Sequence, residues 1–356
     1  MARGKVRVLV VDDSAFARVS ISKQLSADSE IEVIDVARNG IEALGKVRAL
    51  KPDVVTLDVE MPRMDGLTAL HHIMSECPTP VIMLSSLTAE GATETITALE
   101  RGAVDFLVKS RSSVRPLDSE YMAEDLRTKV KQAATVDVSR LCREEKEGSA
   151  GAKPKQRQRR ATKTRKVVVI GSSTGGPGAL RHVISSLPFD LPAPILIVQH
   201  MPPKFTKALA ERLDSISLIS VKEAELGDRL VPGQALVAPG DYHMTVDEKG
   251  NIELNHLKPE HGVRPAVNVT LEAVAQHYGP LSLCVILTGM GSDGTRGAGL
   301  IKAAGGKVFV EHESTCVVYG MPKSIVDAGS ADKILPRPEI AQAIIDACNE
   351  ETDAAI

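Results

Sequence analysis

The sequence predicts an α/β protein built from two doubly wound domains, each with a parallel β-sheet. In both halves of the chain, short runs of Val, Ile and Leu alternate with amphipathic segments of helical period. The apolar runs are almost continuously hydrophobic, which is typical of strands that are buried on both faces of a parallel sheet. The chain has 356 residues, enough for about two domains of roughly 150 residues each.

The first half of the chain has five apolar runs, each followed by a predicted helix. The strands are expected at Val6–Val11, Ile31–Ala37, Val54–Leu57, Val81–Leu84 and Val104–Val108. The helices are expected near residues 14–27, 39–50, 66–76, 89–101 and 118–135. Five such units predict a (βα)5 domain of ~120 residues.

The second half repeats the alternation and adds a β-hairpin. Strands are expected at Lys166–Ile170, Ala193–Val198, Ser217–Val221, Ala235–Val237, Leu283–Leu287 and Lys307–Val310. Helices are expected near residues 176–187, 204–213, 266–278, 294–304 and 338–347. Between His243 and Leu254 the turn residues Lys249-Gly250-Asn251 predict an antiparallel hairpin. This half is therefore a second α/β domain.

A basic segment separates the two patterned halves. Residues 148–164 contain no aliphatic side chain larger than Ala, so they cannot bury enough apolar surface to offset the entropy of ordering. Residues 153–166 carry eight positive charges and no acid; since the whole chain has a net charge of −3, the rest carries −11. We expect a first domain at residues 5–124, a helix end and basic flexible linker at 125–164, and a catalytic domain at 165–352.

Composition limits the possible classes of function. Aromatic residues make up 3% of the chain and Trp is absent, so stacking platforms for single-stranded nucleic acid are not expected. No apolar run is long enough to span a bilayer and the N-terminus does not read as a signal peptide, so we expect a cytoplasmic protein without membrane insertion. The five scattered cysteines predict neither a disulfide framework nor a zinc cluster.

We expect the protein to be a monomer.

Polar residues stand at the carboxyl ends of the strands in the first domain, where open α/β sheets bind ligands. Asp12 and Asp13 follow the first strand, Asp58 ends the third, Ser85 the fourth, and Lys109 the fifth. Three carboxylates form a site of oxygen ligands suited to Mg²⁺, and the lysine can bind a phosphoryl group. A single acid at a strand end is usually a solvated turn residue, but such placement at successive strands predicts a functional site.

The segments VLVVDDSAFAR, LDVEMPRMDG, MLSSLT and AVDFLVK resemble the receiver domain of two-component response regulators over residues 5–124. The resemblance implies that Asp58 accepts a phosphoryl group from a chemotaxis histidine kinase in the presence of Mg²⁺. It also implies a set of further roles: metal ligands at Asp12, Asp13, Asp58 and the backbone carbonyl of Glu60, a switch hydroxyl at Ser85, a switch aromatic at Phe106, and the receiver lysine at Lys109. Ser110 departs from the pattern, because a proline usually follows that lysine.

Three strand ends of the second domain carry a serine, a histidine and an aspartate. Ser173 lies at the centre of a G-x-S-x-G turn between a strand and a helix, His200 follows the next strand, and Asp293 lies beyond Leu283–Leu287. A hydroxyl activated by an imidazole, which an acid orients, is the arrangement of a serine hydrolase. The order along the chain differs from that of the α/β-hydrolases, so a separate solution to the same geometry is expected.

The motifs GSSTGG, QHMP and TGMGSDG resemble the chemotaxis protein-glutamate methylesterases over residues ~165–350. The resemblance implies hydrolysis of glutamate γ-methyl esters on methyl-accepting chemotaxis receptors and deamidation of certain receptor glutamines. It places the nucleophile at Ser173, the general base at His200 and the orienting acid at Asp293. The backbone N–H groups of Thr174 and Met290 are expected to face the oxyanion, and the esterase reaction needs no cofactor. The loop at residues 260–268 is expected at the mouth of the site, with Arg264 facing the receptor.

Two other functions fit parts of the sequence. A response regulator with a DNA-binding output could use the basic segment on phosphates, but no helix-turn-helix pattern is present, and no specific nucleic acid is expected. A non-catalytic scaffold is disfavoured because all three triad residues are present. The resemblance to the methylesterase family also implies that the unphosphorylated receiver covers the esterase site and moves aside on phosphorylation.

Overall fold

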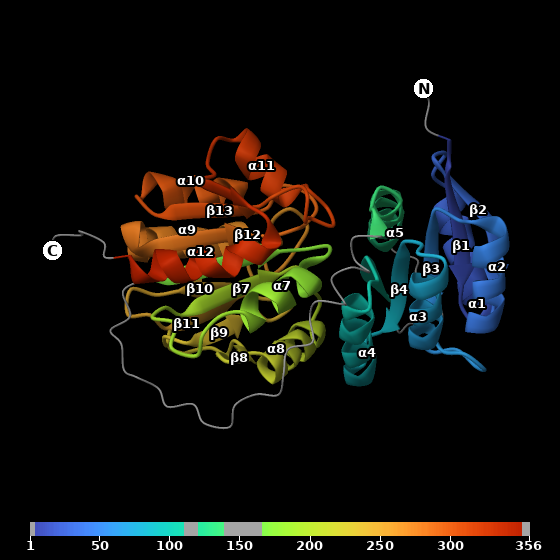
Figure 1. The fold of residues 1–356 in the computed structure, drawn as a ribbon, viewed down its shortest axis with the longest axis horizontal. Helices are drawn as coiled ribbons and strands as arrows, with labels where there is room; N and C mark the ends of the chain where they lie inside the picture. Colours follow the sequence, from blue (N-terminus) through green and yellow to red (C-terminus); the bar gives the residue numbers. More distant parts are fainter. Residues whose placement is uncertain (1–3, 110–119, 139–165, 351–356) are drawn as a thin grey trace. The chain divides into compact units, whose positions relative to one another are not determined.

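The computed structural model describes residues 4–109, 120–138 and 166–350 (Figure 1). The chain divides into two compact units, Met1–Ser149 and Ala150–Ile356, and each is described by itself. Ser110 lies outside the described residues, as does the predicted basic segment apart from Lys166.

The first unit has five strands and five helices within the described residues. Its strands are β1 (Val6–Val11), β2 (Ile31–Ala37), β3 (Val54–Asp58), β4 (Val81–Ser86) and β5 (Asp105–Lys109). Its helices are α1 (Ala15–Ser26), α2 (Gly40–Leu50), α3 (Gly66–Glu76), α4 (Ala89–Glu100) and α5 (Glu120–Ala133). These are the predicted units, in the predicted order.

The strands of the first unit form a parallel sheet in the order β2-β1-β3-β4-β5. Helices α1 and α5 contact each other on one face, and α2, α3 and α4 follow one another on the other face. The strand order reverses between β1 and β3, and ligands of doubly wound sheets bind at such a switch point. The ends of β1 and β3, with their aspartates, therefore lie side by side.

The second unit contains a seven-stranded sheet and a separate hairpin. The strands of the sheet are β6 (Val167–Ser172), β7 (Ile195–Gln199), β8 (Ser220–Glu223), β9 (Gln234–Val237), β12 (Ser282–Ile286), β13 (Lys307–Glu311) and β14 (Lys333–Leu335). The helices are α7 (Gly176–Ser185), α8 (Phe205–Ile216), α9 (Val267–Tyr278), α10 (Thr295–Ala303), α11 (Met321–Asp327) and α12 (Arg337–Asn349), with a 3-10 turn at Gly279–Leu281. The predicted hairpin is β10 (His243–Val246) with β11 (Ile252–Asn255).

All pairs in the seven-stranded sheet are parallel, in the order β14-β13-β12-β6-β7-β9-β8. Helices α7, α8 and α12 cover one face, while α9, α10 and α11 cover the other, and the hairpin packs on α9 (Figure 1). Strand β6 has β7 on one side and β12 on the other, so its carboxyl end is the switch point of this sheet. The turn that carries Ser173 begins there.

The helices that follow the functional strands begin differently in the two units. In the first unit α1 begins at an N-cap side chain, because Ser14 accepts a hydrogen bond from the Ala17 N–H. In the second unit α7 and α10 begin after Gly175 (φ +77°) and Gly294 (φ +94°), and no side chain caps either helix. Glycine adopts this left-handed backbone without the steric cost of a Cβ atom.

Three elements of the second unit differ from the expectation. Strand β8 begins at Ser220 rather than Ser217, because the Ser217 hydroxyl donates to the Leu213 carbonyl (2.5 Å) at the end of α8. Strand β14 and helix α11 were not predicted. Strand β14 has only three residues and is half exposed, so it lacks a hydrophobic run, and α11 is a seven-residue helix that starts with Met-Pro.

None of the helices in the described ranges combines the length and the apolar character that a membrane span requires.

The buried strand β12 gives a prediction about stability. Ile286 is fully buried between β6 and β13, so Ile286→Ala should lower the free energy of unfolding of the second unit by about 2–5 kcal/mol. Ile334, on the edge strand β14, is 43% exposed, and Ile334→Ala should cost less than about 1 kcal/mol. Denaturant unfolding, monitored by hydrogen exchange of the β6 amides, measures the free energy of unfolding of both variants. Equal losses for the two variants would contradict this assignment of the core.

Candidate active site

Ser173 lies in a turn that its neighbours hold at both ends. Its N–H donates to the Thr288 carbonyl (3.1 Å), and its carbonyl accepts from the Gly176 N–H (2.8 Å). A Cβ atom on Gly289 would lie 3.0 Å from the Ser173 Cβ, so the end of β12 approaches the nucleophile turn closely. These contacts fix the backbone of the predicted nucleophile against the neighbouring strand.

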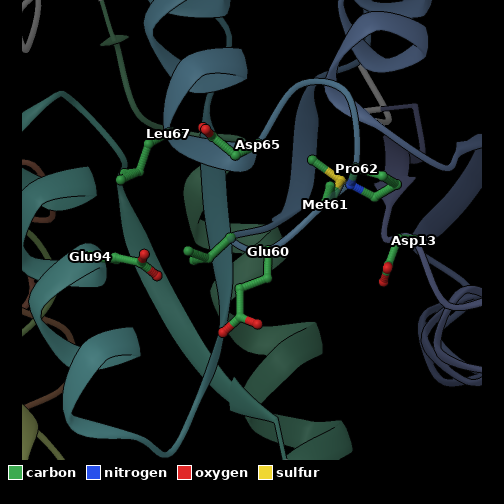
Figure 2. Close-up of a pocket in the computed structure, with 8 residues that line it drawn as sticks. Asp13, Glu60, Met61, Pro62, Asp65, Leu67 and Glu94 are labelled. Carbon is green, nitrogen blue, oxygen red and sulfur yellow. The ribbon is translucent and has the colours of Figure 1, made fainter.

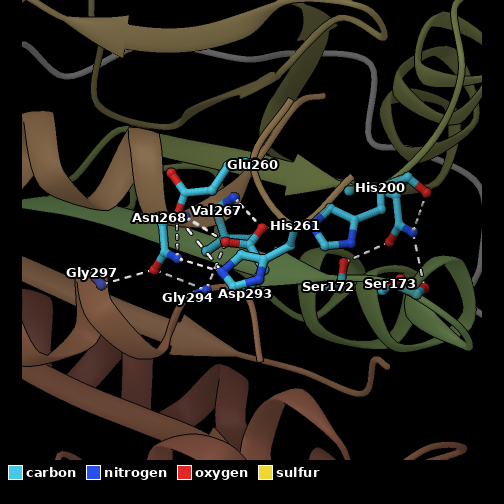
Figure 3. Close-up of polar contacts among 12 residues, drawn as sticks. Ser172, Ser173, His200, Glu260, His261, Val267, Asn268, Asp293, Gly294 and Gly297 are labelled. Carbon is cyan, nitrogen blue, oxygen red and sulfur yellow. Dashed lines mark hydrogen bonds and ion pairs between the residues drawn. The ribbon is translucent and has the colours of Figure 1, made fainter. Parts of the chain in front are cut away.

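His200 and Asp293 form the hydrogen bond that the sequence predicts. The His200 Nε2 atom lies 2.8 Å from the Asp293 Oδ2 atom, and the side chains are 10% and 2% exposed. Because Nε2 faces the acid, Nδ1 is the ring nitrogen left for the role of general base that the sequence predicts. Figure 3 shows the ring turned toward Asp293, with Ser172 and Ser173 on its other side. No hydrogen bond within the described part of the chain joins the Ser173 hydroxyl to the ring, and such bonds often form only with substrate.

The Asp293 carboxylate is surrounded by donors. Besides His200 it accepts the N–H groups of Val267 (2.6 Å), Asn268 (2.9 Å) and Gly294 (2.8 Å). Burial alone would raise the pKa of Asp293, but the hydrogen bond and charge of His200 and the N–H groups of Asn268 and Val267 outweigh it, and the pKa lies below its ordinary value. Asp293 is therefore ionised at neutral pH and can stabilise an imidazolium at His200.

The two expected oxyanion donors belong to peptide units whose carbonyls are held. The Ser173 carbonyl, in the same peptide as the Thr174 N–H, accepts from Gly176 N–H (2.8 Å) and from the Gln199 side chain (2.9 Å). The Gly289 carbonyl, in the same peptide as the Met290 N–H, accepts from two N–H groups at the start of α11, at 3.0 and 2.8 Å. Since a peptide is planar, holding the carbonyl fixes the direction of the N–H.

The loop at residues 260–268 contributes in a different way from the one expected. Its last residues hold Asp293 through backbone N–H groups, and Arg264 also makes contacts within the unit. The Arg264 guanidinium donates to Asp241 and to the carbonyls of His256 (3.0 Å) and Leu257 (2.9 Å). The Arg264 side chain is 19% exposed beside the 53% exposed Asp241, so the expectation that this arginine faces a receptor stays a prediction.

The first unit brings together the predicted acidic residues. Carboxylate oxygens of Asp12, Asp13 and Asp58 lie within 4.8 Å of one another. The Lys109 ammonium lies 2.7 Å from Asp12 Oδ2 and 2.6 Å from Asp58 Oδ2. Burial raises the pKa of Asp58 to about 6; Lys109 opposes this shift and the negative charge of Asp12 adds to it.

The predicted switch residues lie beside this cluster. Ser85 is fully buried, and its hydroxyl donates to the Gly91 carbonyl (3.0 Å), so it is turned toward α4. Phe106 is 5% exposed, and the Lys129 ammonium lies 5.5 Å from the centre of its ring. Glu60 follows Asp58 by two residues, and its side chain accepts from Ser86 (3.4 Å).

A cavity of about 490 Å³ opens next to the acidic cluster (Figure 2). It is lined by Asp13, Val59, Glu60, Met61, Pro62, Asp65, Leu67 and Glu94. Four of the eight are acidic, and burial together with Glu60 and Asp65 raises the pKa of Glu94. The cavity therefore favours a cation over an anion beside Asp58.

Comparison with known proteins assigns both units. A family described as CheB methylesterase matches residues 168–344, and one described as response regulator receiver domain matches residues 8–116. A protein-glutamate methylesterase/protein-glutamine glutaminase of Symbiobacterium thermophilum is 49% identical over 354 residues, which are 97% of this chain and 98% of the relative. The chain belongs to the protein-glutamate methylesterase/protein-glutamine glutaminase family.

Further similar proteins belong to the same family. A member from Thermotoga maritima is 46% identical over 347 residues, 96% of this chain and 98% of the relative. The crystal structure of the Thermotoga maritima CheB methylesterase catalytic domain is 49% identical, covers 51% of this chain and 98% of its own, and has a TM-score of 0.50. The predicted hydrolase class and two-domain α/β architecture are thereby confirmed, and a methylesterase domain, not a DNA-binding one, follows the receiver.

Four buried side chains near the triad were not predicted. They are Gln199 beside Ser173, Asn268 beside Asp293, Thr288 at the end of β12, and Glu311 at the end of β13. Each of these residues lies at or just after the end of a strand, or at the start of a helix. This position in the sequence could have identified them as candidates for the site. Gln199 directly precedes His200 within QHMP, and Thr288 begins TGMGSDG, so the motifs of the methylesterase family already contained two of the four.

Thr288 is held by a buried ion pair. Glu311 Oε2 accepts from the Thr288 N–H (2.8 Å), and Glu311 Oε1 accepts from Arg337 Nε (2.9 Å) at the start of α12. The Thr288 hydroxyl in turn donates to the Thr174 carbonyl (3.0 Å). The ion pair therefore connects α12 and β13 to the nucleophile turn.

Removal of one charge of this pair should destabilise the second unit strongly. Arg337→Leu leaves the Glu311 carboxylate buried without its countercharge, so we expect a loss of about 3–5 kcal/mol in the free energy of unfolding. Lys323→Leu removes the cation of the exposed pair with Asp327 and should cost less than about 1 kcal/mol. Denaturant unfolding measures both variants. A loss below about 1 kcal/mol for Arg337→Leu would show that the pair contributes little.

Proposed function

We propose that the unit at residues 165–352 hydrolyses glutamate γ-methyl esters of methyl-accepting chemotaxis receptors and deamidates certain of their glutamines. The observation that carries the proposal is the buried His200–Asp293 hydrogen bond at strand ends next to the Ser173 turn. The names of the relatives support both activities. The unit at residues 5–124 would be a phosphorylated receiver, with residues 125–164 between the two.

In the first half-reaction Ser173 Oγ attacks the ester carbonyl carbon. His200 Nδ1 takes the hydroxyl proton, and Asp293 stabilises the imidazolium through Nε2–H. The negative charge that develops on the carbonyl oxygen would face the N–H groups of Thr174 and Met290. One such donor contributes about 10²–10³ in rate. The C–O bond to the methoxy group then breaks, and the methoxide leaves as methanol with the proton from His200.

In the second half-reaction water attacks the acyl-enzyme. His200 takes a proton from the water, the new hydroxyl oxygen bonds to the acyl carbon, and the bond to Ser173 Oγ breaks as His200 returns the proton to it. The products are a receptor glutamate and the free enzyme. With a glutamine substrate the same steps release ammonia in place of methanol. The triad thus supplies nucleophile, base and charge stabilisation, and we propose that no cofactor takes part in the esterase reaction.

Asp58 would accept a phosphoryl group from a chemotaxis histidine kinase. The residues fit a divalent cation, because carboxylate oxygens of Asp12, Asp13 and Asp58 lie within 4.8 Å of one another and the Lys109 ammonium supplies a single positive charge against them. Asp12, Asp13, Asp58 and the Glu60 carbonyl would hold Mg²⁺, which neutralises phosphoryl oxygens when bound. Lys109, 2.6 Å from Asp58 Oδ2, would bind a phosphoryl oxygen on Asp58. Phosphorylation would then raise the rate of ester hydrolysis.

Ser173→Ala should abolish methanol release from receptor membranes that carry labelled glutamyl methyl esters. The substitution removes the only atom that we propose to form the acyl-enzyme, so the rate should fall by at least about 10⁴-fold. Ser186→Ala, at the exposed end of α7, is the matched control and should keep the wild-type rate. Methanol release by Ser173→Ala within tenfold of the wild type would exclude Ser173 as the nucleophile.

Asp58→Asn should leave the basal rate of methanol release unchanged and remove its stimulation by a phospho-donor. The amide cannot accept a phosphoryl group, while the triad lies in the other unit. Glu32→Gln, which changes an exposed acid of β2, should keep full stimulation with acetyl phosphate and Mg²⁺. A chelator should abolish the stimulation and spare the basal rate. Undiminished stimulation of Asp58→Asn would refute phosphorylation at this residue.

A further inference from the structure

We propose that Gln199 is a positioning residue of the hydrolase: its side-chain amide holds the peptide between Ser173 and Thr174 and so aims the Thr174 N–H at the oxyanion. The inference rests on the proposed function, because it assumes that Ser173 is the nucleophile. It assigns a role to a residue at the end of β7 that does not itself touch the substrate.

Gln199 connects the nucleophile turn to the strand that carries the base. Its Nε2 atom donates to the carbonyl of Ser173 (2.9 Å) and lies 3.4 Å from the carbonyl of His200. Its Oε1 atom accepts from the Ser172 hydroxyl at 2.6 Å. The side chain is 2% exposed, so water does not replace these partners.

The bond to the Ser173 carbonyl acts on the neighbouring N–H through the geometry of the peptide. The carbonyl of Ser173 and the N–H of Thr174 belong to one planar trans unit and point in opposite directions. The carbonyl accepts from Gly176 N–H (2.8 Å) on the helix side and from Gln199 on the strand side, so the plane cannot rotate. A carbonyl that accepts hydrogen bonds also polarises its peptide, which makes the N–H a stronger donor.

The corresponding peptide at the end of β12 is held without a side chain. There the Gly289 carbonyl accepts two backbone N–H groups, from Gly320 (3.0 Å) and Met321 (2.8 Å). In the turn that carries Ser173, the carbonyl likewise accepts two hydrogen bonds, but one comes from a backbone N–H and the other from the Gln199 amide. Gln199 is thus the side chain through which a substitution can loosen one donor peptide and leave the other intact.

Space for the Gln199 amide is provided by a missing side chain. A Cβ atom on Gly176 would lie 2.0 Å from Gln199 Oε1 and 2.9 Å from its Cδ atom. Any larger residue at this position would displace the amide. The first residue of α7 and the last residue of β7 are therefore fitted to each other.

The test compares Gln199→Glu and Gln199→Met with the wild type in the full-length protein. The glutamate turns a donor into an acceptor that faces the Ser173 carbonyl, and the methionine removes the donor and adds no charge. For both we expect kcat of methanol release from methyl-labelled receptor membranes to fall about 10–100-fold, with KM within about twofold. Gln342→Glu, the same change on the exposed face of α12, should leave both constants unchanged.

Three comparisons separate positioning from a structural role. Rates are expressed per folded molecule, which is determined by circular dichroism, so a variant that only unfolds loses molecules and keeps kcat. Ser172→Ala keeps the amide donor and loses only the bond to Gln199 Oε1, so its kcat should fall less than tenfold. Gly176→Ala keeps the amide and pushes it aside, so its kcat should fall as in the Gln199 variants.

The inference is overturned if folded Gln199→Met and Gln199→Glu keep kcat within about threefold of the wild type. It is also overturned if KM alone rises, since that would place Gln199 in substrate binding. Failure of the proposed function gives a different result, because then the wild type releases no methanol or Ser173→Ala releases as much as the wild type.

Discussion

The Asp293 carboxylate is a buried charge, and the end of β12 is organised around keeping it ionised. Three backbone N–H groups and the His200 ring face its two oxygens. Two of the N–H groups, from Val267 and Asn268, come from the start of α9, where the helix dipole also favours an anion. The same carboxylate selects the ring nitrogen of His200 that turns toward it. The ring nitrogen that remains for the general base that we propose therefore follows from the position of α9.

The two units use one architecture with opposite electrostatic results. In the second unit, hydrogen-bond donors surround the acid that follows β12 and lower its pKa. In the first unit, three carboxylates converge on one lysine, and burial raises the pKa of Asp58 to about 6. Asp293, whose charge is satisfied by donors, is suited to orient the His200 ring. The Asp58 cluster, which has more negative than positive charge, is suited to bind a cation and to accept a phosphoryl group.

Most elements of both sheets were predicted from hydrophobic pattern, because strands buried on two faces must be almost continuously apolar. The pattern failed where burial is partial. In strand β14, Lys333 and Ile334 are exposed, so the sequence contains no apolar run that would predict a strand there. The strand forms because it pairs with β13. Strand β8 begins later than predicted because the Ser217 hydroxyl bonds to the last turn of α8. Strand propensity takes no account of such a hydrogen bond.

The sequence by itself determined which chemical groups stand at the carboxyl ends of the strands. Since parallel strands bring those ends to one edge, it also placed Asp58 beside Asp12 and His200 beside Asp293. Only the tertiary structure decided how these groups are held. The contact of Gln199 with the Ser173 carbonyl and the ion pair of Glu311 with Arg337 join segments 26 residues apart in each case. Such contacts depend on packing between strands and helices, and no local pattern of residues encodes their distance or direction.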